Sequence, residues 1–226
     1  MLLSRIKAYD ESASPEDIFS LALTTIFPDD TINAHGTPGS YVTYRSPSLG
    51  ELRLYIPQYP KEERDRQLFA HLWNGGVVAA DAIERASLNR NKITHINSST
   101  KEQNTGSSLT WNQRFWDVRG KSILELGAGT ALPSIVSALC NAASVTITDH
   151  PSSPALTTGI IEENVKANLS HHTASPYRHD SPVSIHGYAW GSAALYEPGL
   201  SSSTVPLAPA KEFDRVIITD CLWVLI

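Results

Sequence analysis

Two carboxylates and a glycine turn stand at the spacing of a nucleotide-type cofactor site. Glu125 comes two residues before Gly127-Ala128-Gly129, and Asp149 follows Gly129 by twenty residues. Backbone N–H groups in such a turn can bind an anionic group, because glycine leaves their approach open. An acid at the position of Asp149 can accept hydrogen bonds from both hydroxyls of a ribose. The pattern therefore predicts a site for a cofactor that contains ribose.

The residues around the turn favour S-adenosylmethionine over a dinucleotide. A dinucleotide fingerprint has a third glycine where the helix packs close to the strand beside the pyrophosphate, but Leu132 stands at that position. S-adenosylmethionine has no pyrophosphate; its carboxylate suits the N–H groups of the turn, and its ammonium suits Glu125, directly or through water. Asp149 fits both classes of cofactor and does not distinguish them. The alternative is a turn that only links a core strand to a helix, and the two flanking acids argue against it.

Strands and a helix with matching patterns surround these groups. Four segments have the pattern of a buried strand, namely Ser122–Leu126, Ser144–Thr148, Val183–His186 and Phe213–Asp220. An apolar helix at Ala131–Ala142 follows the glycine turn. The order of strand, turn, helix and strand predicts an α/β fold with a doubly wound, mostly parallel, Rossmann-like sheet. Ligands of such sheets bind at the carboxyl ends of the strands, so Thr219, Asp220 and Trp223 should lie beside the glycine turn.

The composition of the chain limits its partners. Its 226 residues carry a net charge of −5 with no basic block, so nucleic acid is not an implied partner. Two cysteines, Cys140 and Cys221, make no disulfide framework and fit a reducing compartment. No apolar run reaches transmembrane length, and the spacing of the histidines matches no metal-ligand pattern. We therefore expect a cytoplasmic protein that uses no membrane, metal or nucleic acid.

The N-terminal part of the chain predicts an accessory unit. A helix is expected from Ser14, an N-cap residue that precedes a proline, and the alternating stretches Tyr41–Tyr44 and Glu51–Ile56 predict a β-hairpin. We interpret this hairpin as an accessory element, whose simplest role would be to cap one edge of the sheet. We therefore divide the chain into an extension at residues 1–66 and a cofactor-binding domain at residues 67–226. Within the domain, residues 89–109 form a polar segment that we expect to be a flexible insertion.

Two tryptophans are candidates for contact with the cofactor. Trp73 stands in a predicted helix, Gln67–Leu88, just before Gly75-Gly76. Each glycine costs a helix about 1 kcal/mol relative to alanine, so we expect a local break or a close approach to a ligand there. Trp190 follows the third strand between glycine-flanked positions and can lie flat against an adenine ring. A role in the core is open for both residues on spacing alone.

Several motifs together resemble a known family, the seven-β-strand methyltransferases, and within it the protein lysine methyltransferases. The closest resemblance is to the fungal branch that methylates the N-terminal amine and a nearby lysine of translation elongation factor 1-alpha, formerly described as nicotinamide N-methyltransferase-like. The matching segments are Pro15–Phe19, Phe27–Asp30, Leu68–Gly75, Leu124–Gly129, Thr148–Pro151 and Gly187–Gly191. The glycine motif is general to methyltransferases, whereas Leu72-Trp73-Asn74 and Tyr188-x-Trp190-Gly191 indicate the subgroup.

The resemblance implies a function and a set of pocket residues. It implies methyl transfer from S-adenosylmethionine to a protein amine, with elongation factor 1-alpha as the protein partner. In the family, the positions of the glycine turn, Trp73, Asp149, Trp190 and Thr219 line the cofactor pocket. Two alternatives stay open, a small-molecule acceptor such as nicotinamide and a non-catalytic interaction module or inactive fragment.

The C-terminal part departs from the family pattern. Asp220 is followed three residues later by Trp223, where the group usually has tyrosine. We expect Asp220 to orient the acceptor amine and Trp223 to form an aromatic wall around it. The chain ends at Ile226, whereas the family sheet has further strands. We therefore expect the C-terminal strands to be missing and the fourth strand to form an exposed apolar edge.

Overall fold

The computed structural model describes most of the chain after the first segment. The described residues are 34–61, 71–88, 111–171, 181–192, 194–196, 204–206 and 212–221. The predicted helix from Ser14 and the predicted insertion at 89–109 lie outside these residues.

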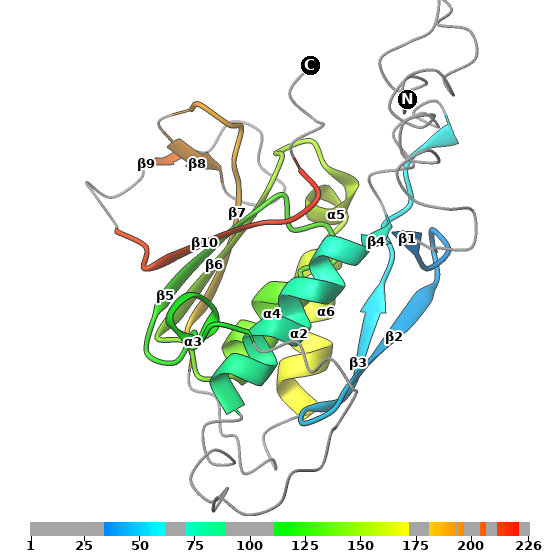
Figure 1. The fold of residues 1–226 in the computed structure, drawn as a ribbon. Coiled ribbons are helices and arrows are strands. Elements are labelled where there is room, and N and C mark those ends of the chain that lie inside the picture. Colours follow the sequence, from blue (N-terminus) through cyan, green and yellow to red (C-terminus); the bar gives the residue numbers. More distant parts are fainter. Residues whose placement is uncertain are drawn as a thin grey trace, which may run out of the picture.

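A mixed sheet of six strands forms one layer of the molecule (Figure 1). Its strands lie in the order β10 (Arg215–Ile218), β5 (Ser122–Leu126), β6 (Ser144–Asp149), β7 (Val183–Gly187), β8 (Ala194–Tyr196) and β9 (Thr204–Pro206). The first four are parallel, and β8 and β9 add an antiparallel pair beyond β7. All four predicted strands are therefore confirmed, whereas the pair β8–β9 had no signal in the sequence.

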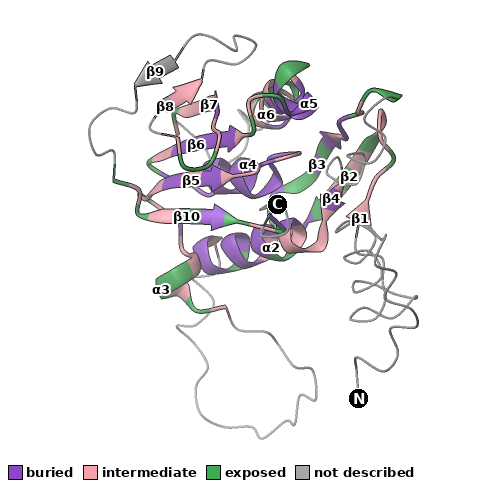
Figure 2. Ribbon diagram, turned by 90° about the horizontal axis from the view of Figure 1, so that it is seen from above, coloured by how far each residue is buried: buried purple, intermediate pink, exposed green. Residues whose placement is uncertain are grey.

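Three helices cover one face of this sheet (Figures 1 and 2). They are α2 (Asn74–Leu88), α4 (Leu132–Leu139) and α6 (Ile160–His171). Helix α4 connects β5 to β6, and α6 lies between β6 and β7 in the chain, as expected of crossovers between parallel strands. These features confirm a Rossmann-like α/β fold; helices on both faces stay a prediction. Among the described helices, none combines the length and the apolar character that a membrane span needs.

The N-terminal hairpin packs on the helices and does not cap the sheet. Strands β2 (Tyr41–Ser46) and β3 (Gly50–Tyr55) form their own two-stranded sheet on the far side of the helix layer (Figures 1 and 2). A second small pair joins β1 (Ala34–His35) to β4 (Leu72–Trp73). The role of an edge cap was therefore wrong: Leu52 and Leu54 of β3 pack against the helix layer.

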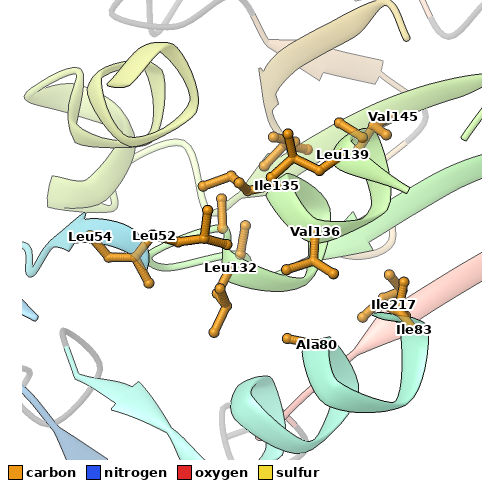
Figure 3. Close-up of a cluster of buried hydrophobic side chains, with 14 of the residues drawn as sticks. Leu52, Leu54, Ala80, Ile83, Leu132, Ile135, Val136, Leu139, Val145 and Ile217 are labelled. Atoms are coloured by element: carbon orange, nitrogen blue, oxygen red, sulfur yellow. The ribbon is translucent and has the colours of Figure 1, made fainter. Parts of the chain in front are cut away.

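One hydrophobic core joins the three layers. Leu52 and Leu54 of β3 lie toward Leu132 at the start of α4 (Figure 3), and these side chains are fully buried. On the other side of α4, Leu139 lies near Val145 of β6 in the same cluster. Helix α4 is thus buried on two sides, which explains why every one of its residues is buried.

Two predicted helices are shorter than the sequence indicated. The segment Leu72–Trp73 is a strand, and α2 begins only at Asn74, so the predicted helix Gln67–Leu88 breaks before its two glycines. The helix predicted at Ala131–Ala142 is α4, which spans only Leu132–Leu139. After β6, α5 (Pro154–Thr157) and α6 are separated at Gly159, which has a positive φ of 74°. A short helix, α3 (Gln113–Trp116), precedes β5.

Strand β10 forms an apolar edge within the described part of the chain. Its hydrogen-bonded neighbour there is β5 alone, and Val216 and Ile218 are 53% and 47% exposed. The expected exposed edge is therefore present among the described residues.

A core substitution in the hairpin tests whether the three layers unfold together. Leu54→Ala should lower the free energy of unfolding by about 2–5 kcal/mol, because it opens a cavity between β3 and the helix layer. The change is measured by urea unfolding of the whole chain. Val78→Ala on the exposed face of α2 is the control and should stay within about 0.5 kcal/mol. If wild type unfolds in two transitions and Leu54→Ala shifts only the first of them, the layers do not share one core.

Candidate cofactor site

The glycine turn is fixed at the carboxyl ends of β5 and β6. Gly127 and Gly129 have positive φ angles of 68° and 53°, which favour glycine. The Ala128 N–H donates to the carbonyl of Thr148 at 3.0 Å. The Thr148 hydroxyl in turn donates to the carbonyl of Glu125 at 2.7 Å. The turn is therefore tied to both strands that flank it.

Asp149 lies at the end of β6 and binds the same turn. Its carboxylate accepts the Gly129 N–H at 2.8 Å and the His150 N–H at 2.7 Å. Burial raises the pKa of Asp149, and these two N–H groups oppose the rise. The Ser153 side chain is a third donor to Asp149, and a carboxylate has about four acceptor positions, so capacity remains for a hydroxyl donor. Two N–H groups of the turn, those of Ala128 and Gly129, are thus already bonded within the protein.

Glu125 is a buried carboxylate beneath the turn. Only 1% of its surface is exposed, and Oε2 accepts the N–H of Ser134 in α4 at 3.2 Å. Within the described part of the chain, Oε1 has no hydrogen-bond partner. Burial raises the pKa of Glu125 to about 8, and the bonds from Ser134 oppose the rise. A buried oxygen without a partner is costly, so a donor or cation bound there would stabilise it.

Asp220, at the end of β10, binds the N-terminus of α2. Its backbone is left-handed, with a φ of 53°, and its carboxylate accepts the N–H groups of Gly75 and Gly76. Burial raises the pKa of Asp220, and these N–H groups oppose the rise. A Cβ built on Gly75 would overlap the Asp220 carboxylate. Gly75 is therefore explained by a close approach, as expected, but by a side chain of the protein itself.

Cys221 shows that the three acids converge. Its sulfur lies against Gly127, where a Cβ would stand only 2.5 Å from it. Burial, and then the charges of Asp149, Glu125 and Asp220, raise the pKa of Cys221 to about 12. All three acids thus interact electrostatically with this one thiol, although they come from the ends of three different strands. Sequence reasoning missed this contact, because nothing near Cys221 in the chain signals it.

The remaining candidates lie around this edge to different degrees. Trp73 is partly buried in β4, directly before α2, and Thr219 is partly buried at the end of β10. Trp190 is 37% exposed in the loop after β7, and the Tyr188 N–H ties that loop to the Asp149 carbonyl at 2.8 Å. Trp223 lies outside the described residues. The described side chains contain no group of three or more His, Cys, Asp or Glu residues able to hold a metal.

A parallel sheet with a glycine turn and a ribose-type acid defines the class of Rossmann-like cofactor domains. A family model described as lysine methyltransferase matches residues 58–224. The chain belongs to the lysine methyltransferase family, as its motifs predicted.

Curated relatives agree with this assignment. Proteins named protein N-terminal and lysine N-methyltransferase EFM7 match from Schizosaccharomyces pombe, 34% identical over 180 residues, and from Candida glabrata, 29% identical over 158 residues. These matches cover 76% and 63% of this chain, and 53% and 55% of the relatives. The chain therefore spans about half the length of the curated relatives it matches.

The two glycines at the start of α2 should respond differently to alanine. Gly75→Ala should lower the free energy of unfolding by about 1–3 kcal/mol, because its methyl group displaces the Asp220 carboxylate. Gly76→Ala is the matched control; its nearest neighbour, Leu72 Cδ1, lies at 3.4 Å, and alanine favours a helix by up to about 1 kcal/mol. Thermal unfolding compares the two. Equal effects would show that Asp220 does not make Gly75 necessary.

Glu125 should give the chain a pH-dependent stability. Its pKa rises from 4.5 to about 8 on folding, so the folded state holds a proton that the unfolded chain releases between these values. Stability should therefore fall as pH rises through this window, by at most about 1.4 kcal/mol per pH unit. Glu125→Gln has no group that titrates here, so its stability relative to wild type should rise from pH 5 to pH 8 and then level off. Parallel urea-unfolding profiles across that range would contradict the assignment.

Proposed function

We propose that the domain at residues 67–226 transfers methyl groups from S-adenosylmethionine to a protein amine, either an N-terminal amine or a lysine. Membership of the lysine methyltransferase family and the names of the relatives support this reaction class. One structural observation carries the choice of cofactor, namely the buried Glu125 oxygen without a partner beside the turn that Asp149 holds. The proposal takes the sheet to be the doubly wound sheet of this class.

The residues at the strand ends fit S-adenosylmethionine. Asp149 keeps acceptor capacity for a ribose hydroxyl, and Glu125 can accept from the ammonium, directly or through water. A Cβ built on Gly129 would meet nothing within 4 Å, so the turn is open on that side. The other residues proposed to line the pocket are Trp73, Gly127, Ala128, Trp190 and Thr219.

The chain itself contributes orientation and charge. When bound, S-adenosylmethionine would supply a sulfonium methyl group to in-line attack by an amine, in which the N–C bond forms as the C–S bond breaks and a neutral thioether leaves. Asp220 has acceptor positions beyond those used by Gly75 and Gly76, so it can accept from the acceptor amine and orient its lone pair. Three converging carboxylates also make the site favourable for a cationic donor. Trp223 is proposed to add an aromatic wall beside Asp220.

We further propose that the acceptor belongs to translation elongation factor 1-alpha. The motif resemblance to the fungal branch supports this partner, and the names of the relatives support an N-terminal amine or a lysine as the acceptor. The net charge of −5 is compatible with a basic protein substrate but does not select one.

Calorimetric binding of S-adenosylhomocysteine to this 226-residue chain tests the cofactor site. Wild type should bind with a micromolar Kd, about −8 kcal/mol. Asp149→Asn should weaken binding at least about tenfold, because a ribose acceptor is lost while the Gly129 N–H keeps an oxygen partner. Asp81→Asn, at a surface carboxylate that binds Arg85, is the control and should leave Kd unchanged. A folded chain that does not bind would overturn the proposal.

Methyl transfer to defined acceptors then tests the reaction. The acceptors are an N-terminal peptide of elongation factor 1-alpha, the same peptide with a blocked amine and no lysine, and nicotinamide. The proposal expects labelling of the first peptide alone. Labelling of nicotinamide alone would identify a small-molecule enzyme, and cofactor binding without transfer to any acceptor would identify a non-catalytic module.

A further inference from the structure

Two asparagines on α6 hold the backbone of the hairpin. Asn164 Oδ1 accepts the Tyr55 N–H at 2.7 Å, and its Nδ2 donates to the Tyr55 carbonyl at 3.1 Å. One turn later, Asn168 makes the same pair of bonds with Arg53, at 2.9 Å and 2.8 Å. Both amides are buried, with 1% and 4% of their surfaces exposed. Together they act in place of a neighbouring strand for β3.

The spacing of helix and strand explains why this pairing works. Four helical residues rise by about 6 Å, and two strand residues rise by about 6.6 Å. Asn164 and Asn168 therefore face alternate residues of β3, whose N–H and carbonyl groups point away from β2. The edge of the hairpin is thereby satisfied without another strand.

The two asparagines differ in the bond that their second Nδ2 hydrogen makes. Each Nδ2 has a second hydrogen: that of Asn168 goes to the Asn164 carbonyl in its own helix, at 2.7 Å. That of Asn164 goes to the carbonyl of Thr130, at 3.2 Å. Thr130 is buried and directly follows Gly129 in the turn. One amide group therefore contacts both the hairpin and the cofactor turn.

This bond completes the support of the turn. Three consecutive turn residues are each held by a different residue, since Ala128 is bound by Thr148, Gly129 by Asp149 and Thr130 by Asn164. The first two supports come from β6 and its end, and the third comes from α6. Because Asn164 is almost fully buried, a shift of β3 would move its amide and the Thr130 carbonyl together.

We propose that Asn164 is a positioning residue for the cofactor turn and couples docking of the hairpin to cofactor binding. The inference rests on the proposed function, because it takes the turn to be the cofactor site. Asn168 holds the hairpin in the same way, but its second Nδ2 hydrogen bonds to its own helix, so it separates the positioning role from a structural one.

The test compares Asn164→Asp with Asn168→Asp in the full chain. Each variant keeps the oxygen acceptor and loses two donor bonds of a buried amide, so both should lower the thermal midpoint by a similar amount. Only Asn164→Asp should weaken S-adenosylhomocysteine binding, by at least about tenfold. Equal affinities of the two variants, at matched stability, would overturn the proposal. If either aspartate variant does not fold, serine at both positions makes the same comparison.

Hydrogen exchange of the cofactor-free chain gives a readout that needs no ligand. In Asn164→Asp the amides of Ala128 and Gly129 should exchange at least about tenfold faster than in wild type, while Asn168→Asp leaves them near the wild-type rate. Equal exchange in both variants would overturn the positioning role. If wild type does not bind S-adenosylhomocysteine, the proposed function fails, and this exchange comparison still decides whether Asn164 positions the turn.

Discussion

The structure depends on carboxylates at strand ends that bind backbone N–H groups of neighbouring segments. Glu125, one residue before the end of β5, binds α4 through Ser134. Asp149 ends β6 and binds the turn through Gly129, and Asp220 follows β10 and binds the start of α2. Helix N-termini and tight turns leave such N–H groups without partners of their own, and a carboxylate satisfies them with a charge-assisted bond. The sheet thus fixes the position of each loop and helix that surrounds its carboxyl edge.

This arrangement brings three acids together in a partly buried region, where burial raises the pKa of Glu125 to about 8 and so keeps it protonated near neutral pH when no cation is bound. The charge of Asp149 adds to burial in raising the pKa of Glu125, and Cys221 feels all three acids. Like charges brought together at low dielectric are costly, and a bound cation would relieve that cost. S-adenosylmethionine carries two cationic groups, so its binding would use an electrostatic feature that the fold has already built. The same feature makes a dianionic pyrophosphate a poor ligand for this edge, in agreement with the leucine at position 132.

The sequence was sufficient for those features that follow from local pattern. The four parallel strands, the glycine turn and the place of Asp149 were predicted, because period-two burial and glycine spacing are visible over a few residues. The start of α2 was missed, since the Leu72–Trp73 strand depends on its pairing with β1, far away in the chain. Gly75 signalled a close approach, but its partner Asp220 is remote in sequence. Docking of the hairpin was missed for the same reason, because no sequence pattern indicates that Asn164 and Asn168 bind the backbone of a remote strand.

The position of Asp220 shows how these remote contacts depend on one another. Among the described residues, strand β10 pairs with β5, so backbone hydrogen bonds hold β10 on one side only. The carboxylate that follows it reaches α2, and α2 packs along α4, the helix that begins after the glycine turn. The end of β10 is therefore held on one side by β5 and on the other, through α2, by α4. Because both routes meet at the glycine turn, a shift of the turn would move Asp220 as well. The groups proposed to hold the cofactor and the acceptor thus share one mechanical support, although β10 is the edge of the described sheet.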